Sequence, residues 1–151
     1  MERYNTIVQA LPNTFNVWTD GSCWHVDRGG AFAYIVEGPD GVILDTYAQA
    51  VSDTTVSRME LTAALRALES FKTRSVVQLI TDSEYLAKGL VFFMDGWRSS
   101  GWRIKNADLW KNLYDVYHFH DVYVTKILGH SGEKNNEYVD KLASNTRKKL
   151  L

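Results

Sequence analysis

The apolar positions of this 151-residue chain form strand-like runs in its first third and then change to a helical period. Residues 14–20, 30–38 and 41–51 are rich in apolar, β-branched and aromatic side chains, and glycine-rich or Pro-Asp-Gly segments separate them. The Gly-Pro-Asp-Gly segment at 38–41 favours a tight turn, because proline presets φ and glycine accepts a positive φ. We therefore predict three strands that pair as an antiparallel meander.

A helical period begins in the segment 57–72, where Leu61, Ala64, Leu65 and Leu68 recur on one face of a predicted helix. The same patterns predict strands at 75–82 and 120–129 and helices at 83–94 (ending near Asp95-Gly96), 106–119 and 135–150, the last with Val139, Leu142, Ala143 and Thr146 aligned. The resulting order, βββαβααβα, fits an α/β fold in which helices pack on the faces of a mixed sheet.

The composition fits one globular domain, because 45% apolar and 13% aromatic residues can bury a sizeable core. No low-complexity segment, solenoid repeat or linker divides the chain, so we expect a leader over 1–13 and one domain over 14–151. No apolar run approaches the ~20 residues that span a bilayer, and the N-terminus lacks a signal-peptide layout. With a single cysteine, Cys23, these features predict a cytoplasmic protein without a membrane partner.

Two predicted strands end in similar sequences, Trp-Thr-Asp-Gly-Ser around Asp20 and Ile-Thr-Asp-Ser around Asp82. In sheets with helical crossovers, ligands bind beyond the carboxyl ends of neighbouring strands, so the two aspartates can converge on one point. Like charges held there repel unless a cation lies between them. A hard divalent ion is the natural occupant, since the sequence offers no Cys/His cluster that favours zinc.

Each acidic candidate also has a purely structural interpretation. Asp82 directly precedes a predicted helix and can cap it. Glu60 fits a capping box with Ser57, in which each side chain bonds the backbone N–H of the other residue. Asp140, in the middle of the last predicted helix, can be one half of a solvated charge pair. No one of these acids decides the function alone.

Residues 96–107 combine three basic side chains with two tryptophans and contain no acidic residue, although the whole chain has a formal net charge of −1. Basic groups can follow phosphates while flat rings lie against sugars, which indicates a nucleic-acid surface. The alternative is a helix–loop–helix corner whose tryptophans belong to the core and whose charges are solvated. Both interpretations can hold in part.

Five motifs follow one another along the chain: TDGSC at 19–23, TT..RMEL.AA..ALE at 54–69, TDS.Y at 81–85, GW...GW at 96–102 with DLW at 108–110, and GH.G...NE..D.LA at 129–143. Together they resemble ribonuclease H of the bacterial type I class, over most of the chain from residue 15 to about 145. Any one motif alone is weak. Their order is highly specific.

The resemblance implies a ribonuclease H-like fold, with a five-stranded mixed sheet of three antiparallel strands followed by parallel strands, and helices on both faces. It implies an endonuclease that hydrolyses the RNA strand of RNA–DNA hybrids and leaves 3′-hydroxyl and 5′-phosphate ends. In the family four acids bind two Mg²⁺ ions, which Mn²⁺ can replace, and by motif these are Asp20, Glu60, Asp82 and Asp140. We expect a monomer whose partner is the hybrid.

Rival functions are a nuclease on the same fold that acts on DNA, such as a resolvase or transposase core, and a non-catalytic hybrid-binding module. The full set of type I motifs disfavours the first. The second predicts loss of a metal-binding carboxylate, and none of the four is missing. A globular adaptor would have no reason to hold four acids in this motif order.

By the same resemblance, His130 corresponds to a histidine that helps to move protons or release product. An imidazole titrates near neutral pH, which suits this auxiliary catalytic role. We expect its loss to slow turnover without abolishing metal binding. His25, His118 and His120 are predicted to be exposed or structurally bonded.

Substrate contacts are predicted by resemblance and by the need to recognise ribose through its 2′-hydroxyls. They are Gly21, Ser22, Cys23 and Asn136 for the RNA strand, Thr55 and Ser57 for the DNA strand or a phosphate, and Phe93, Trp97, Arg98, Arg103 and Lys105 in a basic protrusion that grips the DNA strand. The chain departs from the family pattern at WHVDRGG (24–30), TTVS (54–57) and the short RIKNA loop (103–107). These departures affect substrate contacts rather than metal ligands.

Overall fold

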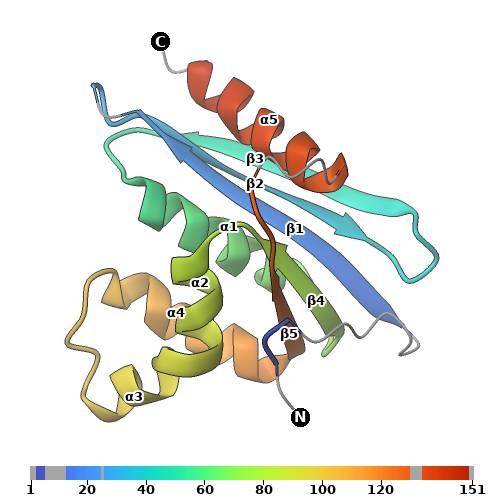
Figure 1. Ribbon diagram of the computed structural model, residues 1–151, viewed down its shortest axis with the longest axis vertical. Helices are drawn as coiled ribbons and strands as arrows, with labels where there is room; N and C mark the ends of the chain where they lie inside the picture. Colours follow the sequence, from blue (N-terminus) through green and yellow to red (C-terminus); the bar gives the residue numbers. More distant parts are fainter. Residues whose placement is uncertain (1–2, 6–12, 25, 130–133, 150–151) are drawn as a thin grey trace.

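The computed structural model describes residues 3–5, 13–24, 26–129 and 134–149. Its strands are β1 (Thr14–Cys23), β2 (Gly30–Glu37), β3 (Ile43–Val51), β4 (Val76–Thr81) and β5 (Asp121–Lys126). Its helices are α1 (Val56–Glu69), α2 (Glu84–Lys88), α3 (Met94–Ser99), α4 (Ala107–Phe119) and α5 (Lys134–Lys148), with a π-helical turn, η1 (Gly89–Phe93), between α2 and α3. The predicted alternation of strands and helices is confirmed (Figure 1).

The strands form one mixed sheet in the order β3-β2-β1-β4-β5. β1 pairs antiparallel with β2, and β2 with β3, whereas β4 lies parallel to both β1 and β5. This is the predicted arrangement of three antiparallel strands followed by parallel strands. In the β1–β4 pair, Trp18 lies opposite Ile80. Asp20 and Asp82 therefore each follow this pair by two residues, at matching positions on adjacent parallel strands.

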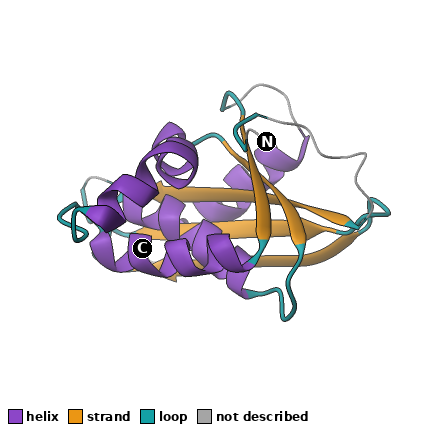
Figure 2. Cartoon of the chain, turned by 90° about the horizontal axis from the view of Figure 1, so that it is seen from below, coloured by secondary structure: helices purple, strands orange, loops and turns teal. Residues whose placement is uncertain are grey.

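Side chains of β1 alternate between two apolar layers, as the two-residue period of a strand requires. Val17 is fully buried in the larger core, to which α1, α2 and α4 contribute. Trp18 belongs to a second core with Val139 and Ala143 of α5. Helices therefore cover both faces, as predicted, and Figure 2 shows the strands as one twisted layer among them.

The helical segment after β4 is longer and less regular than predicted. The predicted end near Asp95-Gly96 is wrong, because α3 continues to Ser99, shortly before Gly101 adopts a φ of +83°. The π-helical turn begins at Gly89, where an added Cβ would lie 2.2 Å from the Trp110 ring. Glycine at this position lets the tryptophan pack directly against the turn.

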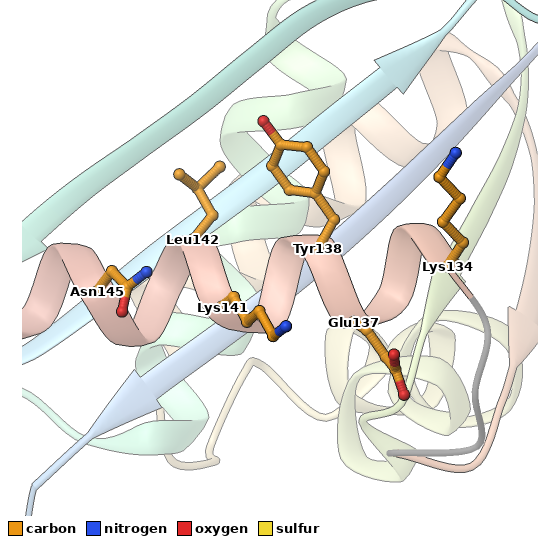
Figure 3. A pocket seen from close by; sticks show the side chains of 6 residues that line it. All are labelled: Lys134, Glu137, Tyr138, Lys141, Leu142 and Asn145. Atoms are coloured by element: carbon orange, nitrogen blue, oxygen red, sulfur yellow. The ribbon is translucent and has the colours of Figure 1, made fainter.

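The inner face of α5 also differs from the prediction. Its buried residues are Asn136, Val139, Ala143 and Arg147, whereas the predicted Leu142 and Thr146 are only half-buried. Two polar residues thus belong to the buried stripe, which the apolar period alone could not reveal. The opposite face lines an open cavity of about 520 Å³, shown in Figure 3 with Lys134, Glu137, Tyr138, Lys141, Leu142 and Asn145.

Residues 3–5 contact the sheet beside β5. Tyr4 forms a parallel bridge with Val124, and Arg3 forms an ion pair with Asp121 while its guanidinium lies 4.2 Å from the Tyr123 ring centre.

No helix in the described part of the chain is long and apolar enough to cross a membrane.

Candidate active site

The carboxyl ends of β1 and β4 place two aspartates side by side. Asp20 lies in β1 and is only 7% exposed, and Asp82 directly follows the end of β4 and is half-buried. The predicted convergence of these two strand ends follows from the parallel register of the pair. The charge of Asp82 acts on Asp20, so the two side chains share one electrostatic environment.

Gly21 brings the third acid to the same place. A Cβ added to Gly21 would lie 2.5 Å from the backbone nitrogen of Glu60 and 2.6 Å from the carbonyl carbon of Met59. Only glycine therefore allows α1 to approach β1 so closely that Glu60 lies beside the strand end. Ser22, the next residue of β1, is half-buried.

Glu60 is not required for capping, so its predicted capping box with Ser57 is wrong. Thr55 is the N-cap of α1, and its hydroxyl accepts a hydrogen bond from the backbone N–H of Arg58 at 3.1 Å. Burial raises the pKa of Glu60, and the negative charge of Asp82 raises it further. A hydrogen bond with Ser83 acts in the opposite direction and lowers it. Glu60 therefore faces the acidic site.

Asp82 does not cap the following helix either. Ser83 is the N-cap of α2, and its hydroxyl accepts a hydrogen bond from the backbone N–H of Leu86 at 3.1 Å. A Cβ added to Gly129 would lie 3.1 Å from Oδ2 of Asp82, so the chain after β5 passes close to this carboxylate. The structural alternative for Asp82 is thus excluded.

Asp140 on α5 completes the acidic site by its hydrogen bond with Asp20. Burial raises the pKa of Asp20 to about 9, and this hydrogen bond and the negative charges of Asp82 and Asp140 act in the same direction. A hydrogen bond from the Gly21 backbone opposes the rise. A carboxyl in this environment stays protonated at neutral pH unless a cation replaces the proton.

The donor set fits a hard divalent ion, since it consists of carboxylates from four different elements. Within residues 3–5, 13–24, 26–129 and 134–149, no three His, Cys, Asp or Glu side chains stand close enough to form a ready-made metal site. The acids interact in pairs instead, with Asp20 beside Asp140 and Asp82, and Glu60 beside Asp82.

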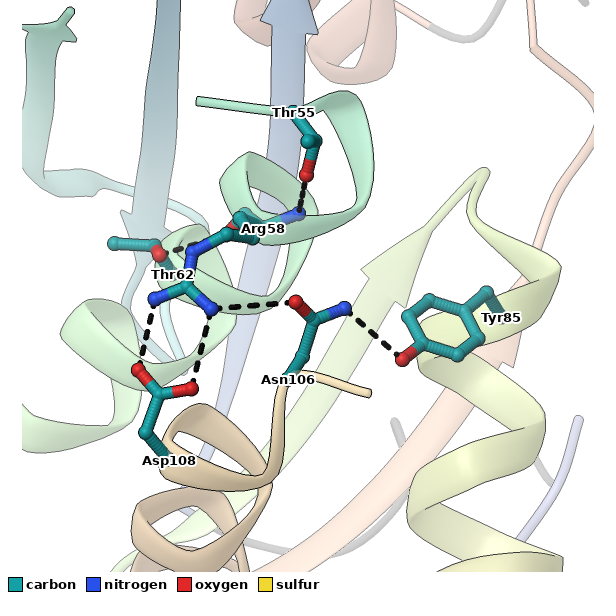
Figure 4. A network of polar contacts seen from close by, with 6 residues as sticks. All are labelled: Thr55, Arg58, Thr62, Tyr85, Asn106 and Asp108. Atoms are coloured by element: carbon teal, nitrogen blue, oxygen red, sulfur yellow. Dashed lines mark hydrogen bonds and ion pairs between the residues drawn. The ribbon is translucent and has the colours of Figure 1, made fainter. Parts of the chain in front are cut away.

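Arg58, the basic residue of the RMEL motif, joins α1 to the start of α4 (Figure 4). Its guanidinium donates to both carboxylate oxygens of Asp108, at 3.1 and 2.8 Å, and to the side-chain oxygen of Asn106 at 3.2 Å. Asn106 in turn donates to the Tyr85 hydroxyl at 3.3 Å. The arginine lowers the pKa of Asp108. This network connects the helix of Glu60 with the basic segment that precedes α4.

A cavity of about 350 Å³ lies beside the end of β1. Cys23, Thr55 and Ser57 line it, so three predicted substrate residues lie together. Trp24 and Arg28 line it as well, although neither belongs to a sequence motif. The sequence feature that could have revealed them is the departure from the family pattern at 24–30, where bulky and charged side chains occupy the turn after β1.

The basic segment, residues 96–107, and Phe93 just before it contain both side chains packed in the core and side chains exposed to solvent. Trp97 is half-buried, with its ring centre 5.0 Å from that of Trp110 and 5.9 Å from that of Phe93. Phe93 is 50% exposed, and Arg98 lies 5.0 Å from the Tyr114 ring centre. Trp97 therefore contributes to the core, while Phe93 and Arg98 reach the surface. The role of this surface in nucleic-acid binding stays a prediction.

The loop between α3 and α4 carries the remaining basic residues. Arg103 and Lys105 are exposed there. Trp102, with a φ of +60°, packs its ring edge-on against Tyr114 at 5.9 Å, which is a structural contact. Asn136, a predicted RNA contact, is 2% exposed and belongs to the buried face of α5.

His120 has the structural role predicted for it. It is 4% exposed, its Nδ1 accepts a hydrogen bond from the Ser75 backbone, and its Nε2 bonds the Leu68 carbonyl at 2.9 Å. Burial lowers its pKa, so the ring is neutral at physiological pH. The predicted catalytic His130, and His25, lie outside the described residues.

Comparison with known proteins gives consistent matches. Residues 12–148 match the RNase H family profile. The chain is 39% identical over 142 residues to a ribonuclease H of Gluconobacter oxydans, covering 89% of this chain and 92% of that protein. It is 38% identical over 140 residues to a ribonuclease H of Methylorubrum extorquens, covering 89% of this chain and 60% of that protein. Among solved structures, LC9-RNase H1, a type 1 RNase H with the type 2 active-site motif, has a TM-score of 0.83 and 26% identity, covering 93% of this chain and 75% of that chain.

The sheet order and the superposition define the class of protein as the ribonuclease H-like α/β fold. Sequence identity across most of the chain makes the assignment specific. The chain belongs to the ribonuclease H family. It is thus a hydrolase that cleaves RNA in RNA–DNA hybrids, as predicted, and the family is typically metal-dependent.

Proposed function

We propose that Asp20, Glu60, Asp82 and Asp140 together bind two Mg²⁺ ions and carry the cleavage of the RNA strand. The observation that supports this most directly is the state of Asp20, whose pKa is raised to about 9 by burial beside other acids. A cation among these side chains relieves their repulsion and keeps them ionised. Asp20 interacts with both Asp82 and Asp140, so it is the residue proposed to contact both ions.

Two divalent ions held by these carboxylates would supply the activation of a water molecule and the stabilisation of the leaving oxygen of a phosphodiester. The four carboxylates supply the anionic ligands, and the scissile phosphate is proposed to lie beside them at the adjacent ends of β1 and β4. His130 is proposed to move a proton or to help product leave, because an imidazole titrates near neutral pH. The products are a 3′-hydroxyl and a 5′-phosphate. Mn²⁺ is proposed to substitute for Mg²⁺.

The hybrid is proposed to lie with its RNA strand at the carboxylates and its DNA strand toward the basic segment. Exposed Arg103 and Lys105 support this orientation, because they place positive charge in the loop before α4. The network around Arg58 supports it as well, since it couples that loop to α1. Base edges need not be read in this arrangement, so cleavage should be largely independent of sequence.

One copy of the chain supplies all four carboxylates, which supports a monomer built on a single domain over residues 14–151. The chain contains one cysteine, Cys23, and its thiol is free. A free thiol suits the reducing cytoplasm, where we place the protein. Light scattering coupled to size-exclusion chromatography tests the monomer, and a dimer mass at micromolar concentration would contradict it.

The decisive experiment uses a hybrid whose RNA and DNA strands carry different end labels, with duplex DNA and duplex RNA as controls. In Mg²⁺ we expect internal cuts in the RNA strand of the hybrid only, and 5′-phosphate ends on the fragments. Chelator should abolish cleavage, and Asp20→Asn should do the same in Mg²⁺. Cleavage of the DNA strand, or cutting that chelator leaves unchanged, would overturn the proposal.

A further inference from the structure

Arg147 lies near the C-terminal end of α5 and is only 7% exposed. Its Nε donates a hydrogen bond to the Ser22 hydroxyl at 2.9 Å. Its guanidinium carbon lies 4.3 Å from the centre of the Trp24 ring, in a cation–π contact. The last turns of α5 are thus attached to the end of β1 and to the turn that follows it; Figure 1 shows α5 lying across this part of the sheet.

Within the described part of the chain, no ion pair accounts for the burial of Arg147. The ion pairs of the described residues do not include it, and its Nη1 is buried without a hydrogen-bond partner among them. A buried guanidinium without a carboxylate is costly, and an apolar side chain of similar volume is often neutral or stabilising at such a position. Stability alone therefore does not explain an arginine here.

The two residues that Arg147 contacts, Ser22 and Trp24, lie beside the acidic site. Ser22 follows Asp20 by two residues in β1, about 7 Å along the strand. Because its oxygen accepts from Arg147, the Ser22 hydroxyl keeps its own proton available for donation to another group. Trp24 lies against the guanidinium and also lines the 350 Å³ cavity that contains Thr55.

We infer that Arg147 is a positioning residue for the substrate, which holds the Ser22 hydroxyl and the Trp24 ring where the end of β1 receives the RNA strand. A guanidinium suits this task, because it donates in its plane and stacks on an aromatic ring through its face at the same time. A lysine ammonium has no planar face to stack on the ring. The inference rests on the proposed function and adds to it a residue outside all five sequence motifs.

The metal ligand on the same helix does not depend on this contact. Asp140 lies about two helical turns before Arg147. Its neighbours Val139 and Ala143 are fully buried against the sheet, with Trp18 in the same core, so they hold this part of α5 in place. Loss of Arg147 should therefore weaken hybrid binding and leave the metal dependence unchanged.

The test is steady-state cleavage of the labelled hybrid by Arg147→Met, which keeps an unbranched side chain and removes the charge and the donors. We expect KM to rise about five- to tenfold, kcat to stay within about twofold, and the Mg²⁺ concentration for half-maximal activity to stay the same. The melting temperature should be unchanged or higher. Arg147→Lys should give an intermediate KM.

If Arg147 acts through Ser22 and Trp24, variants of these two residues should also change KM. Ser22→Ala should raise KM in the wild-type background and add little in the Arg147→Met background, because the hydroxyl is already misplaced there. Trp24→Leu, which also leaves α5 intact, should raise KM on its own.

A lower melting temperature with an unchanged KM would overturn the inference and make Arg147 a purely structural residue. Failure of Arg147→Met to fold would overturn it as well, since the inference gives the arginine no essential part in folding. Unchanged KM values in both Ser22→Ala and Trp24→Leu would do the same. If the wild-type protein does not cleave the hybrid, the proposed function fails instead, so the two failures are distinguishable.

Discussion

Replacing Asp20 by Asn should stabilise the metal-free protein at neutral pH. Burial, the hydrogen bond with Asp140 and the charge of Asp82 raise the Asp20 pKa from 3.8 to about 9. Between these two values the folded chain binds a proton that the unfolded chain has released, so stability falls as pH rises from about 4 to about 9. An amide at this position carries no charge and escapes that cost.

The magnitude follows from the pH interval. Between pH 3.8 and pH 7, the free energy of unfolding falls by about 1.4 kcal/mol for each pH unit. Protonation of Asp20 therefore costs the wild type at most about 4 kcal/mol at pH 7. Burial is the largest cause of the raised Asp20 pKa, and a buried amide is also desolvated, so Asp20→Asn recovers only part of this amount. We expect Asp20→Asn to gain about 1–2 kcal/mol at pH 7, or about 2–8 °C in melting temperature.

The assay is a set of thermal melts in chelator at pH 4, 7 and 8.5, with Asp115→Asn as the matched control, because Asp115 is an exposed residue of α4. The gain of Asp20→Asn should be near zero at pH 4 and grow with pH, while the control stays within about 0.5 kcal/mol of wild type. Adding Mg²⁺ should raise the melting temperature of wild type more than that of the variant. A destabilised Asp20→Asn, or a gain that does not change with pH, would show that Asp20 does not hold a proton in a strained acidic cluster.

Three other predictions concern the support of the site and the grip on substrate. Gly21→Ala should lose about 2–3 kcal/mol in urea unfolding and most activity, because its Cβ would lie 2.5 Å from the Glu60 nitrogen; wild-type stability would contradict this. His130→Ala should turn over more slowly in single-turnover assays with an unchanged Mg²⁺ midpoint, and a shifted midpoint would make it a ligand. Arg103→Ala with Lys105→Ala should raise KM and reduce the salt slope of binding by about 0.7–0.9 per lost phosphate contact; an unchanged slope would remove both from the substrate surface.

Local signals were sufficient for the individual strands and for the pair of strand-end acids, while the full sheet arrangement came from the resemblance. The similar endings around Asp20 and Asp82 are visible in the sequence, and parallel pairing in matching register makes them neighbours. The change from strand-like runs to a helical period gave the correct element order. The positions of Glu60 and Asp140 came only from the resemblance to ribonuclease H, because each had an equally good local interpretation.

The remaining features depend on contacts between distant segments. Thr55 and Ser57 are both good cap residues, and only the actual first turn of α1 decides between them. The π-helical turn at Gly89 is tied to a close contact with Trp110, twenty-one residues later. On α5 the apolar period misplaced the buried face, because Arg147 occupies a position where the pattern favours an apolar residue.

Diffraction from crystals of Asp20→Asn with a short RNA–DNA hybrid and Mn²⁺ tests the central claim most directly, because the anomalous signal locates the ion independently of the protein density. We expect Mn²⁺ among Glu60, Asp82, Asp140 and residue 20, next to a phosphate of the RNA strand. Mn²⁺ bound elsewhere, or the DNA strand at these carboxylates, would contradict it.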